Sequence, residues 1–278
     1  MSTANAGEIR VGEVVLSVRD VSLRLGGTPV LEKVSFDIRD RIRVGFPTGQ
    51  IVALLGPSGV GKTSLLRVLA GLAAPDAGEV LGIGGKRLVA GEVGLVFQSY
   101  PLLAHRTALG NLEVAARIAG LGVRAARERA MELLASFRLA DHARHYPAQL
   151  SGGQRQRVAI AQQLIHEKKL LLMDEPFSGL DPAALDEVMH MVVEVANRDD
   201  LNTILIVTHD IHSAMVVSDT AIMLGRDRLP DGSAAPGGAH VQATYNLVER
   251  GLAYHPELTG KTEFVALELE MRERFKRL

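Results

Sequence analysis

The 278-residue chain contains no cysteine and no tryptophan, and aromatic residues make up only 4% of it. The absence of cysteine excludes a disulfide framework, a cysteine nucleophile and a thiolate metal site. Neither sign of charge prevails, because 31 Lys and Arg stand against 32 Asp and Glu, for a net charge of −1. This balance argues against a protein that binds nucleic acid through a bulk basic field, and we expect no nucleic-acid partner.

Long hydrophobic runs are also missing. No stretch of the sequence approaches the ~18 apolar residues of a membrane-spanning helix. The first residues have neither the basic region nor the apolar core of a secretory signal. Hydrophobic residues nevertheless make up 47% of the chain, enough to bury a core and to exclude a wholly disordered protein. We therefore expect a soluble protein of the cytoplasmic type that reaches a membrane only through a partner.

Short apolar runs predict the strands. Between residues 14 and 55, apolar and polar residues alternate, which predicts a β-rich N-terminal sheet. Five runs are apolar enough to be buried on both faces, as in a parallel sheet. They are Ile51–Leu55, Val93–Phe97, Leu170–Met173, Thr203–Thr208 and Ala221–Leu224. Helical stretches at 62–70, 154–167 and 183–198 separate most of them, so the expected fold class is α/β with a doubly wound core of mainly parallel strands.

The rest of the chain divides into three segments. Residues 99–160 have helical spacing and strong helix formers, which predicts a mainly helical subdomain inserted into the α/β core. Residues 226–240 hold three Gly and two Pro and are expected to form a linker. Residues 241–278 end in a stretch whose apolar residues recur at steps of three and four. We expect this tail to be a helical appendage docked on a protein surface.

The first motif with chemical meaning is a glycine-rich turn between a predicted strand and a predicted helix. It fits the pattern G-x-x-x-x-G-K-[ST] with Gly56, Pro57, Ser58, Gly59, Val60, Gly61, Lys62 and Thr63, followed by Ser64. Glycines let backbone N–H groups surround phosphate oxygens, and the helix N-terminus adds a favourable dipole. The Lys62 ammonium can neutralise the β- and γ-phosphates, and the Thr63 hydroxyl can ligate Mg²⁺. This motif predicts nucleotide binding.

Two carboxylates follow the predicted strand at 170–173. Ligands of an open α/β sheet bind at the carboxyl ends of its strands, which is where Asp174 and Glu175 stand. An acidic pair after a strand is usually a solvated turn, but the phosphate-binding motif changes that interpretation. Asp174 is then expected to hold Mg²⁺, and Glu175 to polarise an attacking water molecule.

A second turn, Ser151-Gly152-Gly153-Gln154, opens the predicted helix at 154–167. Ser151 is a good N-cap residue, and the two glycines would leave the N–H groups of the helix end exposed to an anion. A single phosphate-binding loop does not need two anion-binding helix ends. This turn therefore gives indirect support for a second subunit.

Together these motifs resemble the ATP-binding cassette (ABC) ATPases, the nucleotide-binding subunits of ABC transporters. The resemblance covers residues 14–225 and includes the signature LSGGQRQRVAIA, the strand LLLMDEP and three further sites. Those sites are Gln98 in LVFQSYPLL, Asp181 in the turn Ser178-Gly179-Leu180-Asp181, and His209 in IVTHD. The resemblance implies a P-loop NTPase core in which Gln98 contacts Mg²⁺ and Asp181 belongs to the nucleotide site. It also implies that His209 contacts the γ-phosphate and acts with Glu175 in hydrolysis of ATP.

The same resemblance implies partners. A second ATPase subunit, identical or paralogous, would bind head to tail, so that each ATP lies between one phosphate loop and the other subunit's Ser151 turn. Membrane permease subunits would receive the motion through the Gln98 region, where Tyr100–Leu103 either form a docking groove or simply pack within the subdomain. With a solute-binding protein, the chain would drive an importer similar to the nitrate/taurine group from the cytoplasmic face of the membrane. The alternatives are an export ATPase and a soluble ATPase of iron–sulfur cluster assembly.

Three features depart from the family pattern, and one of them is the pair Gln162 and Gln163, which replaces the usual Arg-Ala after the signature. Leu25 stands where the family usually has an aromatic residue that stacks on adenine. The turn before Gly49 is lengthened within residues 39–48, and we expect the extra residues to extend a β-hairpin.

Overall fold

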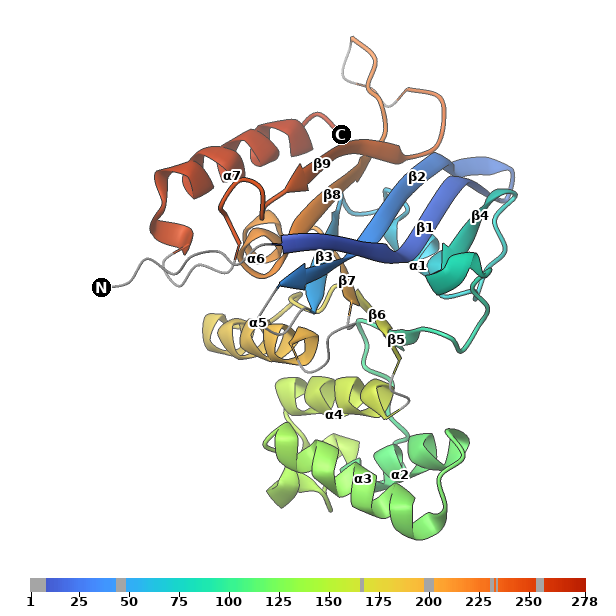
Figure 1. The fold of residues 1–278 in the computed structure, drawn as a ribbon, viewed down its shortest axis with the longest axis vertical. Coiled ribbons are helices and arrows are strands. Elements are labelled where there is room, and N and C mark those ends of the chain that lie inside the picture. The colour runs from blue at the N-terminus through green and yellow to red at the C-terminus, as the bar shows by residue number, and fades with distance from the viewer. Residues whose placement is uncertain are drawn as a thin grey trace.

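The computed structural model describes residues 9–43, 49–165, 168–197, 203–230, 233, 235–253 and 258–278. These residues form an α/β core and a helical subdomain that lies below the core in Figure 1. No helix of the described part of the chain is long and apolar enough to cross a membrane.

The core contains two sheets. The larger has the strand order β5-β6-β7-β3-β8-β9 and the smaller the order β2-β1-β4. The larger sheet is made of β3 (Gln50–Leu55), β5 (Gly94–Val96), β6 (Leu170–Asp174), β7 (Thr203–Thr208), β8 (Thr220–Gly225) and β9 (His240–Asn246). The smaller consists of β1 (Ile9–Leu25), β2 (Thr28–Arg43) and β4 (Ala77–Gly82). All neighbours in the larger sheet are parallel except β8 and β9, and the smaller sheet is antiparallel, so the expected fold class is confirmed.

The central strand β3 contributes to the apolar cores on both faces of the larger sheet. Successive side chains of a strand point to opposite faces. Val52 and Leu54 therefore pack with the small sheet and α1 (Lys62–Leu69), whereas Ala53 and Leu55 pack with α6 (Ile211–Val217) on the other face. Burial of a side chain of the size of Leu or Val contributes about 1.5–3 kcal/mol. Because both faces of β3 are covered, the loop that follows Leu55 starts from a firmly packed strand.

The helical subdomain consists of α2 (Ala108–Ile118), α3 (Val123–Ser136) and α4 (Gly152–Leu164). Thr107 caps α2 by accepting a hydrogen bond from the N–H of Gly110 at 3.1 Å. Arg157 of α4 joins the subdomain to the core through a 2.5 Å ion pair with Glu187 of α5 (Pro182–Ala196). The N–H of Leu95 in β5 also donates to Gln163 Oε1 of α4 at 3.2 Å, although the subdomain stands visibly below the sheet (Figure 1).

The tail after residue 240 differs in part from the expected helical appendage, because its first element is the strand β9. This strand pairs antiparallel with β8, while α7 (Thr262–Phe275) packs on the core of its own chain through Phe264, Leu267 and Met271. The end of the expected linker also packs. The backbone of Ala239 exchanges hydrogen bonds with Val30 and Glu32 of β2, at 2.8 and 2.9 Å. The small residues of this segment permit that close approach, so low apolar content did not prevent packing.

The hairpin of β1 and β2 is lengthened as expected as far as the described residues reach. Ile9 pairs with Arg43 and Val11 with Arg41, while residues 44–48 lie outside the described part. Arg41 Nη2 also donates hydrogen bonds to Thr220 Oγ1 (2.8 Å) and Asn246 Oδ1 (3.1 Å). These bonds fasten the extension to the edge of the larger sheet.

Candidate functional site

The glycine-rich turn leads from the end of β3 to the start of α1. Gly59 has φ +78° and Gly61 has φ +115°, conformations that residues with a Cβ rarely adopt. Lys62 is buried, and its Nζ donates hydrogen bonds to the carbonyl oxygens of Gly56 (2.7 Å) and Pro57 (3.1 Å). The lysine side chain therefore folds back over the turn.

Among the remaining residues of the turn, one is apolar and buried, and the polar ones are exposed or half-buried. Val60 is buried and packs with the core between the two sheets. Ser58 and Thr63 are exposed, and Ser64 is half-buried. The apolar anchor holds the loop against the core while its polar side chains face outward.

Asp174 stands at the last position of β6, opposite the phosphate loop. Its Oδ2 and Oδ1 atoms lie 3.2 and 3.4 Å from Thr63 Oγ1, which donates to the carboxylate. Burial raises the pKa of Asp174, although the hydrogen bond from Thr63 lowers it in part. A hydroxyl and a carboxylate thus converge at one point, as the sequence predicts.

Glu175 occupies the centre of the site. Its Oε1 lies 3.5 Å from Lys62 Nζ, and its Oε2 lies 2.9 Å from His209 Nδ1. Burial lowers the pKa of Lys62, and the Glu175 charge opposes this shift. Glu175 itself has φ +47°, which is uncommon for a residue with a side chain. Since β6, β7 and β3 are neighbours in the sheet, the three groups meet at the carboxyl ends of adjacent strands.

Sequence analysis missed two residues that support this arrangement. Thr208, fully buried at the end of β7, donates from Oγ1 to Glu175 Oε2 at 3.1 Å. Gln156 of α4, also fully buried, donates from Nε2 to the carbonyl of Pro176 at 2.9 Å. The position of Thr208 directly before His209 at a strand end was a usable signal. Nothing in the spacing of the signature marked Gln156.

The other predicted residues near the carboxylates have local partners. Gln98 is exposed, and its Nε2 lies 3.4 Å from Ser178 Oγ. Asp181 caps α5, accepting a hydrogen bond from the N–H of Ala184 at 3.0 Å. The structure therefore places Gln98 beside the turn that ends in Asp181, and shows a structural task for Asp181.

The segment after Gln98 is only partly available for docking. Tyr100 Oη donates to the carbonyl of Pro176 at 3.3 Å, and burial raises the pKa of Tyr100 to about 12. Leu102 packs against the core of the helical subdomain. Pro101 and Leu103 remain exposed.

The Ser151 turn belongs to the helical subdomain. Ser151 Oγ accepts from the N–H of Gln154 (3.2 Å), and Gln154 Oε1 accepts from the N–H of Ser151 (2.9 Å), which forms a capping box. Gln154 Nε2 also lies 3.1 Å from His142 Nε2. Gly152 is exposed and Gly153 is half-buried, and a Cβ at either would meet no atom within 4 Å. Figure 1 shows α4 below the core and α1 within it, so one chain does not unite the two predicted phosphate-binding turns.

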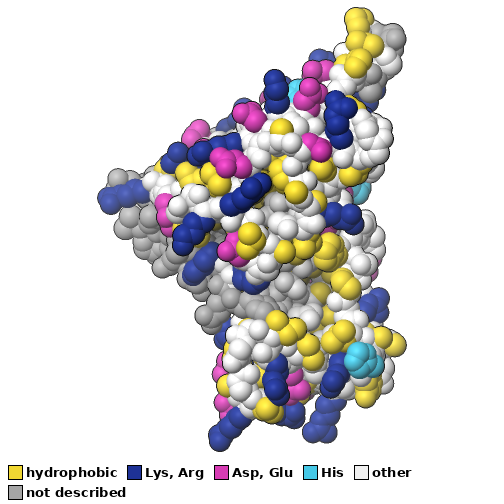
Figure 2. Space-filling view, turned by 90° about the vertical axis from the view of Figure 1, so that its right-hand side faces the viewer, with side chains coloured by type: hydrophobic (Ala, Val, Ile, Leu, Met, Phe, Trp, Pro, Cys, Tyr) yellow, Lys and Arg dark blue, Asp and Glu magenta, His cyan; other side chains and the backbone are white. Residues whose placement is uncertain are grey.

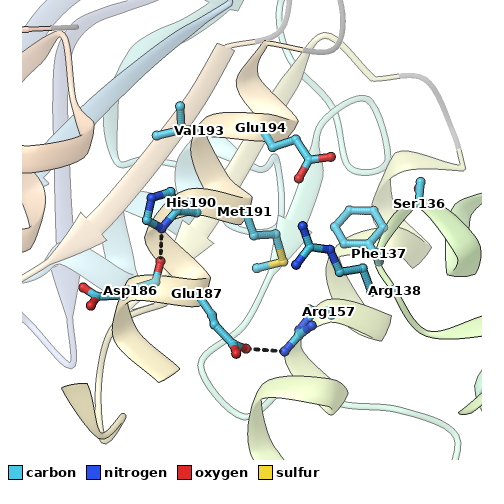
Figure 3. A pocket seen from close by; sticks show the side chains of 10 residues that line it. All are labelled: Ser136, Phe137, Arg138, Arg157, Asp186, Glu187, His190, Met191, Val193 and Glu194. Carbon is cyan, nitrogen blue, oxygen red and sulfur yellow. Dashed lines mark hydrogen bonds and ion pairs between the residues drawn. The ribbon is translucent and has the colours of Figure 1, made fainter. Parts of the chain in front are cut away.

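A hollow of about 540 Å³ lies away from the phosphate loop, where α3, α4 and α5 meet (Figure 3). Its lining residues are Ser136, Phe137, Arg138, Arg157, Asp186, Glu187, His190, Met191, Val193 and Glu194. The ion pair between Arg157 and Glu187 spans it, and His190 Nδ1 donates to the Asp186 carbonyl at 2.8 Å. None of the predicted site residues lines this hollow, which marks the junction of subdomain and core.

The surface carries no large field of one sign on the face seen in Figure 2. Over the core, Lys and Arg side chains alternate with Asp and Glu, and hydrophobic side chains lie between them. The charges that distinguish the site are therefore the buried ones described above.

Comparison with known proteins gives matches over most of the chain. The family model described as ABC transporter matches residues 39–178. A sulfate/thiosulfate import ATP-binding protein of Rhizobium meliloti is 39% identical over 222 residues, which are 75% of this chain and 57% of that protein. An aliphatic sulfonates import ATP-binding protein of Rhodococcus jostii is 44% identical over 177 residues, 63% of this chain and 68% of that protein. The chain spans only 57–61% of several of the sulfate/thiosulfate relatives it matches.

Solved structures share the fold over a longer stretch. A structure from Clostridium perfringens, part of an ABC transporter complex, has a TM-score of 0.71 at 25% identity and covers 95% of this chain and 98% of that one. A dimeric ATP-binding cassette bound to ADP and Pi has a TM-score of 0.66 at 28% identity, with 84% and 98% coverage.

Proposed function

This chain belongs to the ABC transporter ATP-binding family, and from that premise we propose that it is the ATP-hydrolysing motor of an importer. The observation that carries the proposal is the chain of contacts from Lys62 through Glu175 to His209 at the mouth of the phosphate loop. A half-buried carboxylate between a lysine and a histidine is an arrangement suited to the attack of water on a phosphoryl group.

In the proposed mechanism the phosphate loop binds the triphosphate and Lys62 turns from the loop carbonyls to the phosphate oxygens. Glu175 accepts a proton from the attacking water as the water oxygen bonds to the γ-phosphorus. The bond from the γ-phosphorus to the oxygen shared with the β-phosphate breaks in line with this attack, and ADP and phosphate leave. Thr208 and His209 hold the second oxygen of this carboxylate, at 3.1 and 2.9 Å, and so fix its orientation. With Nδ1 engaged by Glu175, the Nε2 atom of His209 is left for the γ-phosphate.

Mg²⁺ fits the donors of this site. Thr63 Oγ1 and the Asp174 carboxylate are hard oxygen ligands that already lie 3.2–3.4 Å apart, and Mg²⁺ commonly takes one or two protein oxygens and completes its shell with phosphate and water. Gln98, beside Ser178, is the third proposed ligand. When bound, the ion would neutralise charge on the phosphates.

A second ATPase subunit, identical or paralogous, would complete each site. The Ser151-Gly152-Gly153 helix end and Gln154 would face the γ-phosphate held by the partner's loop, and Asp181 would lie at the same interface. The open N–H groups of this capped helix end are suited to an anion. Binding of ATP would then close the dimer and hydrolysis would reopen it.

Membrane permease subunits and a solute-binding protein are the remaining proposed partners, which places the chain at the cytoplasmic face of a membrane. The exposed Pro101 and Leu103 are the docking candidates. The named relatives import sulfate, thiosulfate or aliphatic sulfonates. We therefore propose import of a small oxyanion, which these names favour over export and over iron–sulfur cluster assembly.

The test combines activity with partnership. Purified protein should release phosphate from ATP only when Mg²⁺ is present. When the chain is expressed with candidate permeases, it should co-purify with them in detergent, and reconstituted vesicles should accumulate sulfate or sulfonate when supplied with ATP. Isolation with a soluble scaffold protein and no permease would contradict the importer proposal.

A further inference from the structure

The C-terminal helix α7 lies against α6, the short helix that begins two residues after His209. Figure 1 shows α7 beside α6 and β9 on the outer side of the core. The contact is apolar in the middle, where the buried side chains of both helices belong to one cluster. They are Ile211, Ala214 and Met215 of α6 with Phe264, Leu267 and Met271 of α7.

At the edge of this contact lies a group of three hydrogen-bonded side chains, His212, Glu268 and Arg272, which we call the polar cluster. His212 Nδ1 of α6 lies 3.0 Å from Glu268 Oε2 of α7, and Arg272 Nη2 lies 2.6 Å from Glu268 Oε1. The His212 ring also stands edge-on to Phe264, with centroids 5.8 Å apart. Burial raises the pKa of Glu268, but hydrogen bonds from His212 and Arg272 outweigh it and the net shift is downward. The Glu268 carboxylate, 15% exposed, is therefore held from both helices at once.

One cavity lies between this polar cluster and the proposed catalytic groups. A hollow of about 660 Å³ separates the end of α7 from the Glu175 side chain, with residues of the two sides in its wall. On the catalytic side they include Glu175, Thr208, His209 and Asp210, and on the α7 side Leu269, Arg272, Glu273, Phe275 and Lys276. The direct packing contact between α7 and the segment that follows His209 is made by α6.

Only Asp210 separates His209 from the first residue of α6. Asp210 follows His209 and caps α6, accepting a hydrogen bond from the N–H of Ser213 at 3.3 Å. His209 is half exposed, while its Nδ1 must stay 2.9 Å from Glu175. A rotation of α6 would therefore move the histidine out of line, and misplacement of a reacting group by ~1 Å can cost about 100-fold in rate.

We propose that Glu268 is a positioning residue for ATP hydrolysis: through His212 it fixes α6 and thereby holds His209 beside Glu175. This inference rests on the proposed ATPase function. It gives the tail a role in the rate of the chemical step, while nucleotide binding is left to the phosphate loop.

The test compares Glu268→Ala with Glu263→Ala, which removes an exposed carboxylate from the first turn of the same helix. Glu268→Ala should lower kcat for ATP about tenfold and leave KM and the Kd for nucleotide unchanged, whereas Glu263→Ala should match the wild type. Glu268→Gln retains an oxygen that accepts from His212 and should recover most of the rate. His212→Ala should reproduce the loss, and the double variant should be no slower than either single one.

A second readout does not depend on turnover. The imidazole NMR signals of His209 in the nucleotide-free protein should shift in Glu268→Ala and stay in place in Glu263→Ala. A wild-type kcat together with an unmoved His209 signal in Glu268→Ala would overturn the proposal, as would equal losses in both variants. If the wild-type protein fails to hydrolyse ATP, the proposed function fails, and the NMR comparison still decides whether α7 positions His209.

Discussion

The two turns that sequence analysis assigned to phosphate binding are built in opposite ways. At the phosphate loop, Lys62 and Asp174 are each only 6% exposed, and both have partners within the chain. At the signature turn, Ser151 and Gly152 are exposed, Gly153 is half-buried, and the space beside both glycines is open. The phosphate loop thus encloses its charged groups, whereas the signature turn, though capped by its own side chains, presents its glycines to open space.

The two turns differ in exposure because their polar groups are satisfied in different ways. Buried charges are stable only when they are paired, so the phosphate loop must be organised by its own chain. A capped helix end on the surface is already satisfied by water and can await an anion from outside. Each end is therefore half of a site, and the variants below separate the half that performs chemistry from the half that recruits a partner.

The largest effect is expected at Glu175. Glu175→Gln should lower ATP hydrolysis by ~10²–10⁴-fold, the usual contribution of a general base. Binding of ATP should be retained or strengthened, because the carboxylate charge 3.5 Å from Lys62 Nζ would no longer repel the phosphates. Phosphate release and equilibrium binding of a fluorescent ATP analogue measure the two quantities.

Lys62→Ala is the matched comparison, since it removes the other partner of the same ion pair. It should weaken ATP binding itself, because the phosphates lose a charge-assisted hydrogen bond. Hydrolysis at the wild-type rate by Glu175→Gln, or equal loss of binding in both variants, would show that the roles are wrongly assigned.

An effect of intermediate size is expected at the Ser151 turn. Ser151→Arg should leave ATP binding by the isolated subunit within about twofold of wild type, while its bulk and lost cap obstruct the partner's approach. In a Glu175→Gln background, ATP should then no longer produce a dimer in sedimentation velocity. An ATP-dependent dimer that persists would exclude the proposed contact between subunits.

The smallest effect is expected at Leu25, which is 56% exposed at the end of β1. The resemblance to the family predicts that this residue stands where an aromatic residue would stack on adenine. Leu25→Phe should tighten ATP binding by ~0.5–1.5 kcal/mol through stacking. Leu72→Phe, at a leucine that is 53% exposed and follows α1, is the control. Equal affinities for ATP in the two variants would place the base elsewhere.

Motifs whose residues follow one another closely in the chain could be predicted from the sequence. The phosphate loop, the apolar run before Asp174 and the N-cap at Ser151 each depend on residues adjacent in the chain. Because parallel strands bring their carboxyl ends to one edge, the motifs predicted that Lys62 and Glu175 lie together, whereas His209 was added from the resemblance to the ABC ATPases. The α/β class was predictable for the same reason.

What the sequence could not reveal depends on distant partners. The segment HVQATYN has few apolar residues on which to predict a strand, yet β8 offers it an open edge and pairs with it as β9. The stripe of α7 gave no indication of which surface it covers, since any apolar face would satisfy it. Likewise, the hydrogen bond from Thr208 to Glu175 joins residues 33 positions apart.

The left-handed backbone of Glu175 implies a conflict between stability and activity. For a residue with a side chain this conformation costs about 1–3 kcal/mol, and glycine or asparagine would adopt it more readily. The chain nevertheless has a glutamate there, with its N–H bound to the carbonyl of Val207 at 2.8 Å. Selection for stability alone would favour replacement of this glutamate. Variants evolved only for heat tolerance would therefore be expected to lose catalysis at this position before they lose the fold.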